Sequence, residues 1–200
     1  MKVLTTLTSP YGRMVRALVI EKGFEDRVEI VPTVTRTPDT PVLDVNPSGR
    51  VPTLVTDDGT IFEESALICT YIDSLEDPQV LAPQTDWNAR ILEARARSML
   101  DGMAVWAREV RRPENEQSPT IVAHETARGL RLAGVFDKLV ADGAFDGPLD
   151  MAQLTLGCTL HGRSDGRPPG FDWRDNNPSL AAWVDRFGAR PSMQETLPPG

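Results

Sequence analysis

Three stretches of sequence decide the fold of this 200-residue chain: SPYGR at residues 9–13, NPSGRVPTL at residues 46–54 and FEESALI at residues 62–68. The first follows a β-branched run at residues 2–7, so it marks a turn from a strand into a helix. The second leads into a hairpin pattern. The third passes from the end of that hairpin into another helix, so the N-terminal part of the chain divides into strand–helix and hairpin–helix segments.

The N-terminal half carries all the clear strand signals. Residues 2–7 and 27–31 are short β-branched runs, and the segment between them has helical spacing. Residues 53–62 read as a hairpin around an Asp58-Gly59 turn. The order βαβ followed by ββα predicts an α/β domain over residues 1–78.

Beyond about residue 80 the strand signals largely disappear. Apolar residues repeat at helical spacing through residues 86–111 and again through residues 118–142. A capping box at residues 150–153 starts a further helix, with Asp150 as the cap and Gln153 reaching back to it. We therefore expect a linker at residues 79–85 and an all-α helical bundle over residues 86–200.

Composition narrows the functional classes. The chain is 40% apolar and 25% charged, which is typical of a globular protein, and its formal charge of −8 argues against a nucleic-acid partner. It has no run of apolar residues long enough to cross a membrane, and no basic stretch leads into one at the start. We expect a cytoplasmic protein without membrane association. Cys69 and Cys158 fit no zinc spacing, and the two histidines form no metal pattern, so no metal site is expected.

The three quoted stretches, in their order and spacing, resemble those of bacterial glutathione transferases, and the likeness extends over nearly the whole chain. The resemblance implies an α/β thioredoxin-like N-terminal domain that binds glutathione. It also implies an all-α C-terminal domain, which supplies the pocket for a second, electrophilic substrate. We therefore expect glutathione as co-substrate, a small electrophile as the other substrate, no metal, and a homodimer.

The chemistry of such an enzyme requires a lowered thiol pKa. A free thiol has a pKa of about 8.5, and only about 3% of it is thiolate at pH 7. Lowering the pKa by about two units needs roughly 2.7 kcal/mol, and one hydrogen bond to a charged group supplies about 1.5–3 kcal/mol. A hydroxyl at the head of the first helix is therefore sufficient, and Ser9 occupies that place. Tyr11 is the alternative, because other branches of the family use a tyrosine hydroxyl.

Residues around Ser9 allow simpler interpretations. Ser9 followed by Pro10 is also a common helix N-cap with proline at the first helical position. Gly12 leaves room that suits a bound sulfur, or it relaxes the helix start. Residues 1–20 carry Lys2, Arg13 and Arg16 and no acid, so they are locally basic, as an anionic tripeptide requires. We expect Arg13 to contact glutathione.

The second stretch is expected to hold the cysteinyl part of glutathione. In the resembling fold, the backbone of Val51 exchanges hydrogen bonds with the tripeptide, and a cis Val51-Pro52 peptide turns that edge toward it. An ordinary trans proline opening a strand is the alternative. Arg50 is expected to neutralise the glycyl carboxylate.

The third stretch is expected to bind the γ-glutamyl end. An acid beside a hydroxyl at a helix N-terminus matches both an ammonium and a carboxylate, and Glu64 and Ser65 supply these groups. The alternative is capping, with Ser65 as the N-cap and Glu64 just outside the helix.

The first long helix is expected to border the second-substrate pocket. Met99, Met103 and Trp106 lie on one stripe of it, and Tyr11 joins them from the other domain by the resemblance. Most such stripes are simply core. The leading hypothesis is an enzyme that adds glutathione to an electrophilic carbon. A noncatalytic glutathione-binding or protein-docking module, or a glutathione-dependent isomerase or peroxidase, is the alternative.

Overall fold

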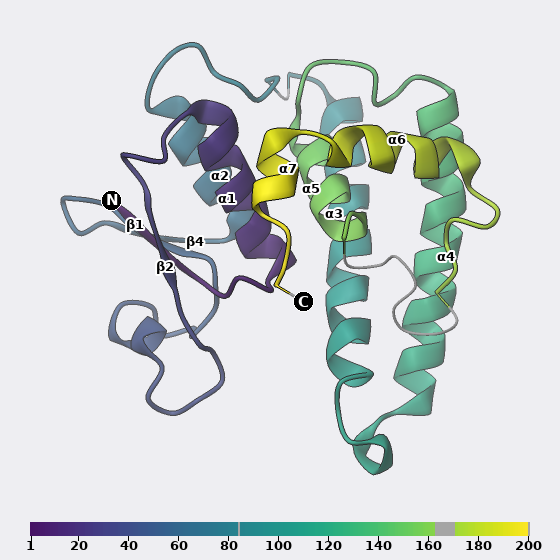
Figure 1. The fold of residues 1–200 in the computed structure, drawn as a ribbon, viewed down its shortest axis with the longest axis horizontal. Coiled ribbons are helices and arrows are strands. Elements are labelled where there is room, and N and C mark those ends of the chain that lie inside the picture. The colour runs from purple at the N-terminus through teal and green to yellow at the C-terminus, as the bar shows by residue number, and fades with distance from the viewer. Residues whose placement is uncertain (84, 163–170, 200) are drawn as a thin grey trace. The chain divides into compact units, whose positions relative to one another are not determined.

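The computed structural model describes residues 1–83, 85–162 and 171–199. Contacts between Cα atoms divide the chain into two units. The first comprises Met1–Ala82 and the segment from Pro191 onward, and the second, the helical unit, comprises Pro83–Arg190. Figure 1 shows the C-terminal segment in yellow. This segment therefore groups with the first unit, although the sequence predicts a helical domain over residues 86–200.

The first unit contains a four-stranded mixed sheet. Its strands are β1 (Lys2–Thr5), β2 (Glu29–Pro32), β3 (Thr53–Val55) and β4 (Ile61–Glu63). They lie in the order β2-β1-β3-β4, with β1 parallel to β2 and the other pairs antiparallel. Val3 lies opposite Ile30 on one side and Leu54 on the other. The predicted α/β class of this half is confirmed.

Helix α1 (Pro10–Lys22) supplies the crossover that joins the parallel strands β1 and β2. Ser9 caps its start, Pro10 occupies the first turn, and Gly23 ends it in the left-handed conformation with φ 69°. Met14, Leu18 and neighbouring apolar residues are buried. Helix α2 (Ser65–Ser74) packs against α1 and follows β4 directly.

Lys22 joins the end of α1 to the chain beyond α2. Its ammonium donates to the carbonyls of Asp73 at 2.9 Å and Pro78 at 2.8 Å, and also to the carbonyl of Glu76. It lies 3.5 Å from Asp73 Oδ1, and both side chains are buried. Asp73 in turn accepts from the N–H groups of Val80 and Leu81. The chain that follows α2 is thus fixed by the buried Lys22–Asp73 pair and its polar contacts, which no sequence pattern predicted.

The helical unit is a bundle of four helices in the described part of the chain. They are α3 (Trp87–Glu109), α4 (Pro119–Ala141), α5 (Met151–Leu160) and α6 (Pro178–Gly188). Helix α3 packs against α4 and α5, and α4 packs against α6 (Figure 1). Every residue of α5 is buried, and a Cβ added at Gly157 would lie 2.3 Å from the ring of Phe187. The predicted all-α class of this half is confirmed.

Side-chain caps start three of these helices: Ser118 caps α4, accepting from Ile121 N at 3.4 Å, and two aspartates cap α3 and α5. Asp86 accepts from Ala89 N at 2.8 Å, and Asp150 accepts from Gln153 N at 2.7 Å. The predicted capping box is only half formed, because the Gln153 amide donates to the carbonyls of Phe145 and Gly147 rather than to the cap residue.

In the ranges that the structure describes, none of the helices has the length and apolar character to span a membrane.

Candidate functional site

The head of α1 is the first part of the candidate site. Ser9 is half-buried, and its Oγ accepts from Gly12 N at 3.2 Å, which is the predicted N-cap. A serine hydroxyl has one proton to donate besides its acceptor lone pairs. In the hydrogen bonds of the described residues, the Ser9 hydroxyl donates to no protein group. The cap therefore uses Ser9 only as an acceptor. Tyr11, the alternative hydroxyl, is half-buried in the first turn of the same helix.

Gly12 lies where α1 approaches β1 most closely. A Cβ added at Gly12 would lie 1.8 Å from Thr5 Oγ1 and 3.0 Å from Thr5 Cβ. The absence of a side chain at Gly12 thus makes room for Thr5, which is fully buried, and not for a ligand sulfur. This close contact sets the position of Ser9 relative to the end of β1.

Arg13 does not lie where the sequence predicts. Its guanidinium is fully buried, donates to the Met193 carbonyl at 2.8 Å and to Thr196 Oγ1 at 3.3 Å, and so holds the C-terminal segment. This segment forms α7 (Pro191–Glu195), which packs on α1. Ser192 adds a hydrogen bond to Glu21 of α1. Because a fully buried guanidinium is not accessible to glutathione, these contacts argue for a structural role.

The Val51-Pro52 peptide is cis, as the sequence allowed. It lies in the loop between the 3-10 helix at Pro41–Asp44 and strand β3. Among the hydrogen bonds of the described residues, none uses the N–H or the carbonyl of Val51. Most backbone groups of a folded chain are paired, so this peptide edge is available to an incoming main chain. Arg50, immediately before it, is exposed.

A group of polar side chains holds this loop, and the sequence analysis gave none of them a role. Asn46 donates to Thr53 Oγ1 at 2.9 Å and to Glu63 Oε2 at 3.1 Å. Ser48 Oγ donates to the same Glu63 oxygen at 2.6 Å. The hydrogen bond from Ser48, then that from Asn46, and to a smaller extent the charge of Arg50, lower the pKa of Glu63 below its ordinary value of 4.5. Asn46 and Ser48 belong to the quoted stretch at residues 46–54, which was the available signal.

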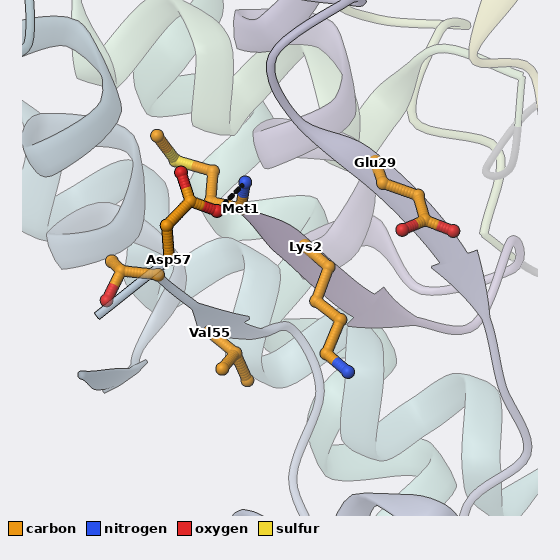
Figure 2. Close-up of a pocket in the computed structure, with 6 residues that line it drawn as sticks. Met1, Lys2, Glu29, Val55 and Asp57 are labelled. Atoms are coloured by element: carbon orange, nitrogen blue, oxygen red, sulfur yellow. Dashed lines mark ion pairs between the residues drawn. The ribbon is translucent and has the colours of Figure 1, made fainter. Parts of the chain in front are cut away.

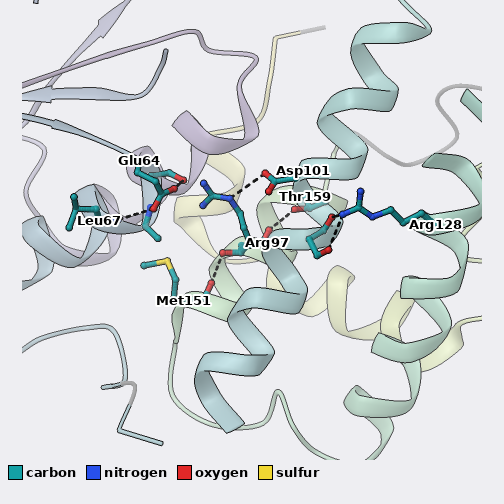
Figure 3. Close-up of polar contacts among 11 residues, drawn as sticks. Glu64, Leu67, Arg97, Asp101, Arg128, Met151 and Thr159 are labelled. Atoms are coloured by element: carbon teal, nitrogen blue, oxygen red, sulfur yellow. Dashed lines mark hydrogen bonds and ion pairs between the residues drawn. The ribbon is translucent and has the colours of Figure 1, made fainter. Parts of the chain in front are cut away.

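The head of α2 is the third part of the candidate site. Glu64, and not Ser65, is the N-cap, and its carboxylate accepts from Ala66 N at 3.2 Å and Leu67 N at 3.4 Å (Figure 3). Glu64 has a φ of 80°, in a region that side-chain-bearing residues rarely adopt. Ser65 is buried in the first turn, and its hydroxyl lies 3.3 Å from Glu64 Oε1. An acid and a hydroxyl therefore lie together at a helix N-terminus, as predicted.

The predicted pocket residues of α3 lie in the core of the helical unit. Trp106 donates from its indole N–H to Thr126 Oγ1 at 3.0 Å, and its ring lies 5.6 Å from that of Phe171. The sulfur of Met103 lies 3.2 Å from the position of a Cβ at Gly129 on α4. Met99, Met103 and Trp106 are all buried. These contacts favour the core alternative over a substrate pocket.

A polar cluster also joins α3 to α4. Arg128 donates to the carbonyl and hydroxyl of Ser98 at 2.8 and 2.9 Å and pairs with Glu125 at 3.4 Å (Figure 3). A Cβ at Gly102 would lie 2.6 Å from the Glu125 carboxylate, so this glycine lets the charge approach α3. The cluster ties two helices together within the bundle.

A separate hollow of about 210 Å³ lies at the start of β1 (Figure 2). Met1, Lys2, Glu29 and Asp57 line it, and the N-terminal ammonium pairs with Asp57 at 2.6 Å. Ser9 follows the opposite end of β1, so this hollow is not the site that the motifs predict. Among residues 1–83, 85–162 and 171–199, no three His, Cys, Asp or Glu residues form a group that could hold a metal ion.

Comparison with known proteins gives matches to both halves of the chain. The model of the glutathione S-transferase N-terminal domain matches residues 8–75, and that of the C-terminal domain matches residues 119–186. The chain is 28% identical over 203 residues to YibF, an uncharacterized GST-like protein of Escherichia coli K12, with 100% of this chain and 99% of that protein covered.

Solved structures agree with these matches. A glutathione transferase family member from Pseudomonas fluorescens Pf-5, with bound S-(propanoic acid)-glutathione, is 28% identical, with a TM-score of 0.85 and 100% of both chains covered. A glutathione S-transferase from Methylobacillus flagellatus KT with bound glutathione is 29% identical, with a TM-score of 0.86 and 99% of both chains covered. Both halves of the fold and both domain models thus agree, and the chain belongs to the glutathione S-transferase family.

Proposed function

We propose that the chain is a glutathione transferase. It activates the glutathione thiol as a thiolate for attack on an electrophilic, hydrophobic second substrate. The observation that carries this proposal is the hydroxyl of Ser9, which caps α1 as an acceptor and keeps its proton for a ligand. The choice of co-substrate is supported by the S-(propanoic acid)-glutathione bound in the Pseudomonas fluorescens structure and by the glutathione bound in the Methylobacillus flagellatus structure.

In this proposal Ser9 is a hydrogen-bond donor and not a base. A serine hydroxyl is too weak a base to hold the proton of a thiol, so its useful role is to stabilise the thiolate once it has formed. The N-terminus of α1 adds about 0.3–1 kcal/mol to the hydrogen bond of about 1.5–3 kcal/mol. Together these contributions match the roughly 2.7 kcal/mol that a two-unit pKa shift requires.

The other parts of the site bind the ends of the tripeptide. The open N–H and carbonyl of Val51 pair with the cysteinyl main chain, as an added strand pairs with a sheet edge. Glu64 and Ser65 bind the ammonium and carboxylate of the γ-glutamyl group at the head of α2. The exposed Arg50 neutralises the glycyl carboxylate. We omit Arg13 from the binding set because its guanidinium holds the C-terminal segment.

The second substrate and the oligomeric state are also proposals. Tyr11 is proposed to line the electrophile pocket, whereas the burial of Met99, Met103 and Trp106 favours a place in the core. A homodimer would show twice the chain mass of 22.0 kDa in light scattering. Isomerase or peroxidase activity would use the same thiolate with a different partner, and a noncatalytic binding module would not need the Ser9 donor.

The proposal is tested by the pH dependence of kcat/KM with a generic aromatic electrophile. Ser9→Ala should return the pKa of bound thiol towards about 8.5 and lower the rate at neutral pH by about one to two orders of magnitude. Much of that loss should be recovered at higher pH. Ultraviolet titration of the bound thiolate measures the same pKa directly, and Thr8→Ala, an exposed hydroxyl in the same loop, is the matched control.

Tyr11→Phe decides between the two hydroxyls. If Tyr11→Phe moves the profile and Ser9→Ala does not, the thiolate donor is Tyr11. If neither moves it, backbone N–H groups hold the thiolate and Ser9 is only a cap. Glutathione binding without turnover of any electrophile by the unmodified protein would replace the transferase with a binding module.

A further inference from the structure

The loop that carries Val51 is built around one buried amide. Asn46 is 3% exposed, and its amide nitrogen donates to both Thr53 Oγ1 and Glu63 Oε2. Its amide oxygen accepts from Ser48 N at 2.9 Å. Thr53 and Glu63 are directly opposite each other in the β3–β4 pair. Asn46 therefore joins the start of its own loop to both strands of the hairpin.

Two further contacts extend this fixation to the residue before Val51. Thr53 Oγ1 donates to the Arg50 carbonyl at 2.8 Å, and Arg50 N donates to Ser48 Oγ at 3.3 Å. Ser48 is itself held by Glu63 Oε2 at 2.6 Å. The peptide units on both sides of Arg50 are thus bound by side chains, and the chain reaches Val51 in a fixed direction.

The fixation stops at the peptide edge itself. Within the described ranges, the N–H and carbonyl of Val51 take part in no hydrogen bond, although both the N–H and the carbonyl of Arg50 do. A loop that only led the chain into a strand would be expected to pair these groups. A network of side chains that holds a loop while leaving one peptide open is what preorganised recognition of a main chain requires.

We propose that Asn46 and Glu63 are positioning residues that hold the Val51 peptide edge in the orientation that binds the cysteinyl main chain of glutathione. This inference rests on the proposed function, because it names how that ligand is oriented. Neither residue contacts the ligand in this scheme. Their effect is on affinity for glutathione, and the Ser9 hydroxyl at α1 acts on the thiol separately.

Glu63 provides the acceptor that makes the network possible. Its Oε2 receives both Asn46 and Ser48, and the same two hydrogen bonds keep its pKa low, with the Arg50 charge a smaller contribution. The carboxylate therefore remains an acceptor at neutral pH. A glutamine retains one acceptor oxygen at this place, whereas a leucine has none.

The test uses steady-state kinetics and calorimetry with glutathione. Asn46→Asp keeps the shape but turns the donor into an acceptor that faces the Glu63 carboxylate. We expect KM and Kd for glutathione to rise about tenfold, since a hydrogen-bonded positioning contact is lost. The kcat at saturating glutathione and the pKa of the bound thiol should stay near their original values. Glu63→Leu should act in the same way, and Glu63→Gln should restore most of the affinity.

Asp58→Ala is the matched control, because it removes a carboxylate that accepts from a threonine hydroxyl and a backbone N–H at the other end of the same hairpin. It should leave KM for glutathione unchanged. If Asn46→Asp and Glu63→Leu bind glutathione as tightly as the unmodified protein, or if they lower kcat with KM unchanged, the positioning role is wrong while the transferase proposal stands.

The two proposals can also fail the other way. If the unmodified protein binds glutathione without turning over electrophiles, while Asn46→Asp and Glu63→Leu weaken that binding, the transferase proposal fails and the positioning role stands. A protein that binds no glutathione overturns both. Glu63 is exposed, so its variants report on the loop even if Asn46→Asp does not fold.

Discussion

The two units differ in what becomes of the residues that their sequences single out. In the first unit, Ser9 and Val51 lie at half-buried cap and loop positions, and each keeps hydrogen-bonding capacity that no other described residue uses. In the helical unit, Met103 and Trp106 are only 8% and 4% exposed, and they contact groups of their own bundle. Turn and cap motifs therefore identify groups with unused bonding capacity, whereas helical periodicity identifies core.

Truncating Trp106 should have the largest effect. Trp106→Ala removes a buried ring that packs near Phe171 and donates to Thr126, so we expect a loss of about 3–5 kcal/mol in the free energy of unfolding. Trp87 lies on the same helix and is 77% exposed, so Trp87→Ala should change stability by less than about 1 kcal/mol. Urea unfolding of the two variants measures the difference.

The difference between the two units would be contradicted if Trp106 bound the electrophile. In that case Trp106→Ala would keep its stability and instead raise KM for the electrophile. Equal losses of stability in Trp106→Ala and Trp87→Ala would mean that burial in the bundle does not decide the role of these side chains.

Arg13→Met tests the first unit at a smaller scale. The variant keeps an apolar stem but removes the donors to the Met193 carbonyl and Thr196, so unfolding should become easier by about 1.5–3 kcal/mol. Because Arg13 is fully buried, KM for glutathione should be unchanged. Arg112→Met, which removes an exposed ion pair with Glu116, should cost at most about 1 kcal/mol. A raised KM with unchanged stability in Arg13→Met would return this residue to the ligand.

A residue's role can be predicted from sequence when its partners lie nearby in the chain. The cap at Ser9 and the turn at Asp58 involve partners two or three positions away, so local patterns contain the necessary information. Arg13 binds a carbonyl 180 positions later in the chain, and no local pattern can indicate that contact. The sequence therefore predicted that Arg13 contacts the ligand, whereas in the structure its guanidinium binds the C-terminal segment.

The contacts of Asn46 and Glu64 depend on the tertiary structure for a different reason. Asn46 was inside a quoted stretch, but its role depends on the register that brings Glu63 opposite Thr53. The alternative interpretation had Ser65 as the N-cap and Glu64 just outside the helix. The structure has Glu64 as the cap, with a φ of 80° that no sequence pattern indicates. The fold class needed only the order of elements, whereas these roles needed the tertiary arrangement.

The smallest expected effect concerns the pKa values of two aspartates, one in each unit. Asp58, in the exposed hairpin turn, accepts hydrogen bonds from Thr56 Oγ1 and Thr60 N. These bonds, and above all the one from Thr56, lower its pKa from 3.8 to about 2. Asp150 caps α5 in the helical unit, and there burial raises its pKa above 3.8 despite the hydrogen bond from Gln153 N. The same functional group thus shifts in opposite directions in the two units.

The pH dependence of stability follows with opposite signs. Because the pKa of Asp58 is lower in the folded state, this carboxylate stabilises the folded protein at pH values above 3.8, its pKa in the unfolded chain. The stabilisation is lost as the pH falls through about 2. The raised pKa of Asp150 favours the folded state at low pH, and that preference is lost as the pH rises through the folded value. Carbon-detected NMR titration should therefore give a midpoint near pH 2 for Asp58 and a midpoint at higher pH for Asp150. An asparagine at either position keeps a hydrogen-bond acceptor but cannot titrate. Asp58→Asn should therefore remove a loss of stability that occurs as the pH falls. Asp150→Asn should remove a loss of stability that occurs as the pH rises. Coincident midpoints would show that turn hydrogen bonds and helix burial have the same effect on these carboxyls, and the contrast between the units would then not extend to their charges.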